Sequence, residues 1–136
     1  MCGRFNLSFS PKQVRYLDEL GSPFPFSQQP QLDIAPTETI PMLINQQQDL
    51  TSNPQPAWIQ GRWWLVPSWS QGPSSKFSMF NARSETLTSS RAFKKPYQSQ
   101  RCIIPASSYL EWKKVTGGKQ PIELFYPQKP IFFAVI

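Results

Sequence analysis

Histidine is missing altogether from this sequence of 136 residues. Within these residues, its absence excludes mechanisms built on an imidazole base, histidine-containing metal sites and pH switches that depend on histidine. Cysteine is scarce, with only Cys2 and Cys102. Two thiols are too few for a disulfide scaffold or a four-cysteine zinc site. Since there is also no glycine-rich phosphate loop, we expect no metal, no nucleotide and no other small-molecule cofactor.

Long apolar runs are missing as well. No stretch approaches the roughly 18 to 20 apolar residues of a membrane span, and the N-terminus has no signal-peptide core. We therefore expect a cytoplasmic protein with reduced thiols and no membrane partner. A length of 136 residues supports one sizeable core but not two independent domains, which predicts a single domain over residues 1–136.

Basic and aromatic residues are plentiful by contrast. Fourteen Lys and Arg against eight Asp and Glu give a net charge of +6, and 14% of the residues are aromatic. The positive charge is concentrated in residues 62–119, which hold ten basic and two acidic residues. Phosphate-seeking charge beside rings that stack on bases favours single-stranded nucleic-acid binding. Composition alone leaves open a second interpretation, a solvated basic face over an aromatic core.

Fifteen prolines spread over almost every segment favour short strands and fixed turns over long helices. The exception is the segment 10–21. Ser10 suits an N-cap, Pro11 the first helical position and Gly21 the end of the helix. The apolar positions of this predicted helix share one face: Val14, Leu17 and Leu20.

The other segments predict strands. We expect a loop over 22–31, a short helix over 84–93 and a hairpin turn at Gly117-Gly118. Strand-like segments cover 39–44, 57–59, 101–105, 109–114, 122–126 and 131–136, with a further apolar run over 63–66. The continuous apolar run 131–136 is typical of a strand buried on both faces. Together these elements predict an α+β domain dominated by a mixed or antiparallel sheet.

Cys2 is the first candidate for chemistry. Removal of Met1 would leave one residue with both an α-amine and a thiol. Because an α-amine titrates near ~7.7 to 8.0, a useful fraction is neutral at physiological pH. A neutral amine attacks an aldehyde to give an imine, and the adjacent thiol can close a thiazolidine ring. The same pair would also suit hydrolysis by an N-terminal nucleophile, and an incidental cysteine is the third interpretation.

Polar residues farther along the chain could assist. Asn81 offers a donor and an acceptor for a hydroxyl or a developing oxyanion. Glu111 stands between Leu110 and Trp112, where desolvation would raise a carboxyl pKa as a general acid/base requires. Strand alternation could instead point Glu111 to solvent, and both interpretations stay open.

Three arginines are candidates for anion binding. Arg4 lies on the same side of an extended backbone as Cys2. Arg83 and Arg91 are eight residues apart, so a helix would place both guanidinium groups on one face, able to bind successive phosphates. Cys102 is expected to pack as a small apolar residue without chemistry.

Several motifs together resemble the SRAP (SOS response-associated peptidase) family, whose members sense and crosslink abasic sites in single-stranded DNA. The motifs occur in the family's order: Met1-Cys2-Gly3-Arg4-Phe5, Ile34-Ala35-Pro36, Trp63 through Pro67-Ser68-Trp69, Asn81-Ala82-Arg83-Ser84-Glu85-Thr86, Ser90-Arg91-Ala92-Phe93, and Arg101-Cys102-Ile103-Ile104-Pro105-Ala106 through Tyr109-Leu110-Glu111-Trp112. The resemblance implies a compact α+β domain with a barrel-like β core and short flanking helices.

The resemblance also implies roles for individual residues. Cys2 would attack the ring-opened aldehyde of the abasic sugar, with Asn81 positioning the sugar and the amine, and Glu111 as the acid/base. The DNA-binding residues would be the phosphate ligands Arg4, Arg83 and Arg91, the stacking residue Trp69, and Pro36 at the border of the groove. The implied partner is single-stranded DNA with abasic sites, and a cytoplasmic protein would join the nucleoid on damage. Release of Met1 by the protein itself would explain the peptidase label.

The sequence departs from the family's pattern at several positions. Trp64 and Ser108 stand where glycines are usual, and Asp33 replaces an asparagine, which predicts altered loop geometry. Family domains also continue into a segment with an active-site histidine, which predicts an N-terminal portion truncated after Ile136, or completion of the fold by a C-terminal segment or second chain. The alternatives to an abasic-site crosslinker are a cysteine-dependent peptidase and a non-catalytic single-stranded DNA-binding remnant.

Overall fold

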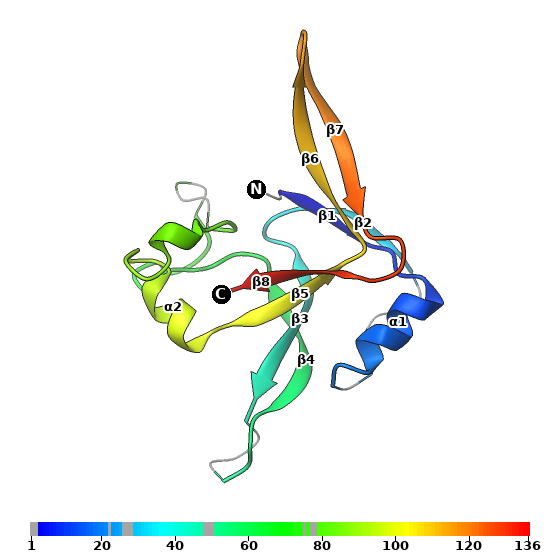
Figure 1. The fold of residues 1–136 in the computed structure, drawn as a ribbon. Coiled ribbons are helices and arrows are strands. Elements are labelled where there is room, and N and C mark those ends of the chain that lie inside the picture. Colours follow the sequence, from blue (N-terminus) through cyan, green and yellow to red (C-terminus); the bar gives the residue numbers. More distant parts are fainter. Residues whose placement is uncertain (1–2, 22, 26–28, 48–50, 75, 77–78) are drawn as a thin grey trace.

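The computed structural model describes residues 3–21, 23–25, 29–47, 51–74, 76 and 79–136 (Figure 1). Its strands are β1 (Arg4–Leu7), β2 (Gln31–Ile34), β3 (Thr39–Gln46), β4 (Gln55–Arg62), β5 (Cys102–Ala106), β6 (Ser108–Val115), β7 (Gly118–Phe125) and β8 (Ile131–Val135). Its helices are α1 (Pro11–Asp18), the 3₁₀ turn η1 (Ser84–Thr86) and α2 (Lys94–Ser99). In the part of the chain that the structure describes, no helix is long and apolar enough to cross a membrane.

The strands form two four-stranded sheets, in the orders β2-β1-β6-β7 and β4-β3-β5-β8 (Figure 1). Every strand pairing within the described residues is antiparallel. The predicted α+β class is therefore confirmed. The two sheets remain open and do not close into a single barrel, so the barrel-like expectation holds only as a description of two sheets that share a core.

The core lies where β1 of one sheet meets β3 and β5 of the other. Phe5, Ile40 and Ala106 are fully buried there. The Phe5 ring stands edge-on to Trp63, with 4.8 Å between ring centroids, and to Phe133, at 5.8 Å. Because edge-to-face aromatic pairs add to the free energy of area burial, these rings join the two sheets.

Helix α1 begins at Pro11 with Ser10 as its N-cap, as the sequence predicted. The Ser10 side chain accepts a hydrogen bond from the Gln13 amide, and the Gln13 side chain accepts one from the Ser10 amide, which together form a capping box. The helix ends at Asp18, ahead of the expected stop at Gly21. Gly21 has another reason to be small, because a Cβ there would lie 2.9 Å from Pro56.

Two expected elements differ in the structure. The apolar run 63–66 is no strand, since the chain bends where the Trp63 amide donates to Glu38 O. Residues 84–93 form η1 and successive turns in place of one helix. Ser89 Oγ donates to Thr86 O, and serine side chains that bond nearby backbone compete with helix continuation. Arg83 and Arg91 therefore do not share a helix face.

Strand β8 differs from the expectation of burial on both faces. It pairs with β5 at the end of its sheet, and its residues are half-buried or exposed, including Phe132 at 36%. An apolar run thus forms an edge strand of the described chain. The hairpin turn between β6 and β7 is also shifted by one residue, because Val115 pairs with Gly118 and the loop is Thr116-Gly117. Gly117 takes a φ of 86°, which glycine adopts without strain.

Candidate functional site

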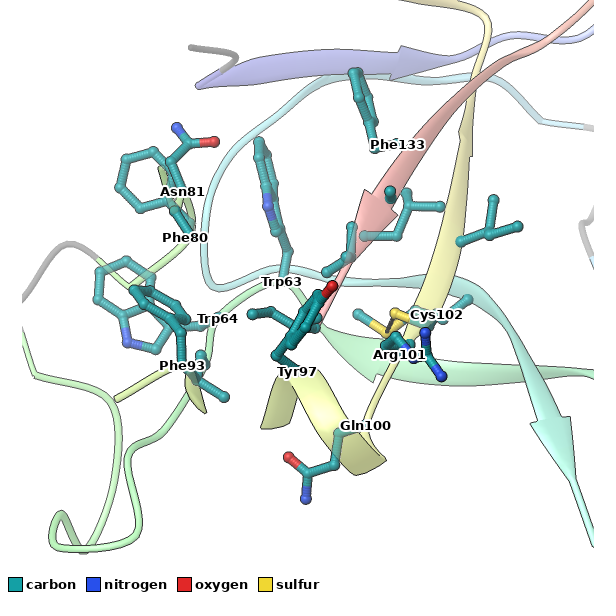
Figure 2. A pocket seen from close by; sticks show the side chains of 18 of the residues that line it. Trp63, Trp64, Phe80, Asn81, Phe93, Tyr97, Gln100, Arg101, Cys102 and Phe133 are labelled. Carbon is teal, nitrogen blue, oxygen red and sulfur yellow. Dashed lines mark hydrogen bonds between the residues drawn. The ribbon is translucent and has the colours of Figure 1, made fainter. Parts of the chain in front are cut away.

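A pocket of about 1060 Å³ opens among β3, β4, β5, β8 and the first half of β6. Residues of the chain between β4 and β5, including Trp63, Asn81 and Arg101, also line it. Aromatic side chains make up much of its wall. Figure 2 shows Trp64, Phe80 and Phe93 on one side of this pocket and Phe133 across from them. Such a concave, largely apolar site with a few polar groups is the usual setting for ligand binding.

Asn81 and Glu111 line this same pocket, although thirty residues separate them in sequence. Glu111 is half-buried on β6, two residues from Tyr109, whose ring packs on Phe133 at 5.9 Å. Asn81 is half-buried beside Phe80 in the chain that precedes η1 (Figure 2). Glu111 lies in the pocket wall, and its role as an acid/base stays a prediction. The arrangement brings an amide and a carboxylate to one cavity.

Cys2 lies outside the described residues, so its thiol and amine have no described position. The first strand residue that anchors the N-terminal segment is Arg4, at the start of β1. Arg4 pairs with Leu110 on β6, one residue from Glu111. The predicted approach of Cys2 to Glu111 therefore stays a prediction.

Arg4 is held by Asp33. Its Nη1 atom donates to Asp33 Oδ2 at 2.9 Å and to Asp33 O at 3.1 Å. Asp33 has a φ of 57°, a left-handed conformation that Asp and Asn tolerate best after glycine, and its amide donates to Asn6 Oδ1. Replacing asparagine by aspartate is thus compatible with this backbone. The main consequence of aspartate at position 33 is a carboxylate beside Arg4. The sequence gives only a weak signal of this contact, namely the position of Asp33 directly before Ile34-Ala35-Pro36.

We expect Asp33→Asn to raise the affinity for single-stranded DNA about two- to fivefold at low salt. The change removes a negative charge that competes with phosphate for Arg4, and exposed ion pairs contribute up to about 1 kcal/mol. Fluorescence anisotropy with an intact single-stranded oligonucleotide measures this affinity. Glu19→Gln makes the same charge change on an exposed residue after α1 and serves as the matched control. Equal effects of both variants would show that only net charge matters.

Trp69 and Arg91 meet directly. The Arg91 guanidinium carbon lies 4.6 Å from the centre of the Trp69 ring, and the ring stays 42% exposed. Cation and aromatic face together offer a phosphate ligand beside a stacking surface. Arg83 is exposed just before η1, and its carbonyl accepts from the Thr86 amide. The sequence spacing predicted that Arg83 and Arg91 share one helix face. In the structure, Arg91 instead contacts the ring of Trp69.

Pro36 lies in the turn Ala35–Glu38, closed by a hydrogen bond from the Glu38 amide to Ala35 O at 3.2 Å. Thr37 has a φ of 84°, and proline followed by a residue with positive φ is typical of a type II turn. The Thr37 amide donates to Trp63 O, and the Trp63 amide donates to Glu38 O. These bonds fix the Pro36 turn to Trp63, which lines the pocket.

At the two positions where glycine is usual in the family, the backbone of this chain is not left-handed. Neither Trp64 nor Ser108 is among the described residues with positive φ. The Trp64 ring packs on Phe80 with 5.6 Å between centroids, so it adds to the pocket wall. Ser108 is buried in β6, where its hydroxyl bonds Asn6 and Glu123. The expected change in loop geometry relative to the family stays a prediction at these two positions.

Cys102 also lines the pocket, where its thiol lies 3.8 Å from the Met42 sulfur. Desolvation by burial raises the pKa of the Cys102 thiol to about 11. The thiol therefore stays protonated and a poor nucleophile near neutral pH. Across the described residues, no group of three or more His, Cys, Asp or Glu side chains is arranged to hold a metal ion.

Comparison with known proteins matches the model of the SOS response associated peptidase (SRAP) family to residues 1–136. Abasic site processing protein YoaM of Bacillus subtilis is 37% identical over 134 residues, covering 97% of this chain and 56% of that protein. Abasic site processing protein YedK of Escherichia coli is 30% identical over 141 residues, covering 100% and 59%. Abasic site processing protein HMCES of Gallus gallus is 32% identical over 149 residues, covering 94% and 43%.

The chain thus spans about half the length of these relatives. Among solved structures, a Bordetella bronchiseptica protein superposes with a TM-score of 0.69 at 23% identity, covering 98% of this chain and 62% of the other. A phage-related protein of the same species gives 0.67 at 24% identity, covering 98% and 59%. At this identity, the two structures support the fold.

Proposed function

Because the chain belongs to the SOS response associated peptidase (SRAP) family, we propose that it processes abasic sites in DNA. The observation that carries this proposal is the match of the family model to residues 1–136. Relatives that align with 94% to 100% of this chain are named abasic site processing proteins. The pocket that holds Asn81 and Glu111 adds a place for the chemistry.

The reaction at Cys2 begins after Met1 has been removed by hydrolysis. The α-amine nitrogen adds to the aldehyde carbon of the ring-opened abasic sugar, and the carbonyl oxygen leaves as water to give an imine. The thiol sulfur then adds to the imine carbon, and its proton passes to the nitrogen. The product is a thiazolidine that links protein and DNA, with one water released overall.

Glu111 and Asn81 assist this sequence from the pocket wall. The Glu111 carboxyl accepts a proton from the attacking amine and returns it to the departing oxygen, the role of a general acid/base. The Asn81 amide hydrogen-bonds the sugar hydroxyl and keeps the aldehyde near the amine. Their common position in one cavity supports this division of roles.

The DNA path follows the cationic and aromatic residues outside the pocket. Arg4, Arg83 and Arg91 bind phosphates, Trp69 stacks on a base, and the Pro36 turn borders the groove. The contact between Arg91 and Trp69 supports a single-stranded partner, because stacking on Trp69 needs a base face that no neighbouring base covers. We propose with this role a cytoplasmic protein that binds the nucleoid after damage.

The chain spans about half the length of the relatives, and we propose that a segment corresponding to their remaining length, from the same chain or from another, packs against this domain. The half-exposed apolar strand β8 and the pocket beside it offer a surface for such a segment. A histidine supplied there would assist proton transfer. Release of Met1 through Cys2 would be the peptidase activity of the same site.

The proposal is tested with a single-stranded oligonucleotide that carries one abasic site. After incubation with the purified protein, a denaturing gel and intact-mass spectrometry should show a one-to-one adduct. Its mass should equal the protein without Met1 plus the oligonucleotide minus one water. The same oligonucleotide with an intact base at that position should give no adduct.

Two results would contradict the proposal. One is the lack of an adduct with abasic DNA, and the other is an adduct of equal yield with intact DNA. If the protein retains Met1 and forms no adduct, but binds single-stranded DNA in a salt-dependent manner, the non-catalytic alternative explains it better.

A further inference from the structure

The hairpin of β6 and β7 extends away from the rest of the described chain (Figure 1). The two strands pair along their whole length, from Ser108 opposite Phe125 to Val115 opposite Gly118. All eight residues of β7 are exposed, and β7 is an end strand of its sheet. The hairpin therefore offers two open faces beyond the core.

The register places lysines on one of these faces. Lys114 lies directly opposite Lys119, and Trp112 lies opposite Pro121. Residues opposite one another in an antiparallel pair share a face, as do residues two apart along a strand. The same face continues to Leu110, which stands opposite Arg4 on β1 and opposite Glu123 on β7. The Glu123 carboxylate accepts hydrogen bonds from Asn6 and Ser108 there. Arg4, Trp112, Lys114 and Lys119 thus form one row, defined here as the cationic row.

At the outer end of the cationic row, Lys114 and Lys119 repel each other when no ligand is bound. Like charges placed directly opposite in a sheet destabilise it. Within the described residues, neither lysine forms an ion pair with a carboxylate. Arg4, at the inner end, is neutralised by Asp33. A polyanion that follows the row would remove the repulsion and add charge complementarity.

We propose that the cationic row binds the sugar-phosphate backbone of single-stranded DNA that flanks the lesion. This inference rests on the proposed function, because it extends the DNA path outward from Arg4. Lys114 lies four positions beyond Leu110 on β6, roughly 13 Å at strand spacing. At about 3.4 Å per nucleotide of one strand, Lys114 and Lys119 contact phosphates up to about four nucleotides beyond those at Arg4.

The opposite face of the hairpin supplies a matched control. Lys113 adjoins Lys114 in sequence but points to the other face, opposite Gln120. Lys113→Gln and Lys114→Gln therefore make the same charge change, one residue apart, at exposed positions of one strand. A difference between them reports the face of the hairpin and not net charge.

The measurement is the affinity for an intact single-stranded oligonucleotide of about 20 nucleotides, by anisotropy, across a series of salt concentrations. For each phosphate that the variant no longer neutralises, the slope of log K against log salt should fall by about 0.7. Lys114→Gln should thus weaken binding about fivefold at 0.1 M salt, and Lys114→Gln with Lys119→Gln about 25-fold. Lys113→Gln should leave the slope unchanged.

Equal slopes for Lys113→Gln and Lys114→Gln would overturn the inference, as would an unchanged slope in the double variant. Urea unfolding tests whether weaker binding results from a loss of stability. Because Lys114→Gln with Lys119→Gln removes a repulsion between two charges, the urea midpoint of the double variant should not fall. Adduct formation with abasic DNA is scored separately. An adduct without a slope change rejects the cationic row alone, whereas a slope change without any adduct rejects the proposed chemistry alone.

Discussion

Cys2→Ala is expected to reduce the denaturation-resistant adduct with abasic single-stranded DNA to background. The variant keeps an N-terminal α-amine whether or not Met1 is removed, so an imine with the ring-opened sugar can still form. It has no thiol to close the ring, and water hydrolyses the imine during denaturation. Quantification of the shifted band on a denaturing gel measures the loss. This is the largest effect we expect from any single substitution.

Two further variants sharpen this result. Cys2→Ser should lose the stable adduct but give one when borohydride reduces the imine, because the amine remains. Cys102→Ala removes the other thiol of the sequence and should leave the adduct yield unchanged, since burial keeps that thiol protonated. A full adduct yield from Cys2→Ala, or loss of the adduct in Cys102→Ala, would assign the chemistry to another group.

Phe5→Ala is expected to lower the free energy of unfolding by about 3 to 5 kcal/mol, the usual cost of removing a fully buried phenylalanine. Phe5 packs on Trp63 and Phe133 and so joins both sheets. Small domains have only about 5 to 15 kcal/mol in total, so this variant should be close to unfolded at room temperature. Urea titration followed by tryptophan fluorescence measures the change.

Phe125→Ala is the matched control for this prediction. It removes the same side chain from a position that is 63% exposed at the end of β7. Substitutions at such surface positions usually change stability by less than about 0.5 kcal/mol. Similar losses in both variants would show that the core lies elsewhere than at the junction of β1, β3 and β5.

The start of α1 was predictable because its signals are local. Ser10, Pro11 and Gln13 lie within one turn, and the bonds that form the cap involve these residues alone. The strands also lie near their predicted positions. Their ends were predicted less well, since β3 and β4 continue past the expected limits to Gln46 and back to Gln55, where pairing with each other satisfies their backbone groups.

The elements that the sequence predicted wrongly depend on contacts with distant or neighbouring residues that the local sequence pattern does not reveal. An apolar run such as 131–136 predicts burial, but whether a strand is central or at an edge depends on its neighbours in the sheet. The run 84–93 was predicted as a short helix, yet the Thr86 and Ser89 hydroxyls bond nearby backbone carbonyls and turns form. The predicted pairing of Arg83 with Arg91 was wrong for this reason.

The sequence by itself determined the α+β class, the capped helix and the family motifs, since these depend on residue type and short spacing. Only the tertiary structure brought Asn81 and Glu111 to one pocket, placed Asp33 on Arg4 across 29 residues, and set Lys114 opposite Lys119. The last two relations follow from strand register, and a shift of one residue would turn each of these side chains to the other face. Asn81 lies outside the strands, in the chain before η1, and reaches the pocket through the packing of that segment. Register is decided by how both sheets pack around Phe5, which involves the whole chain at once.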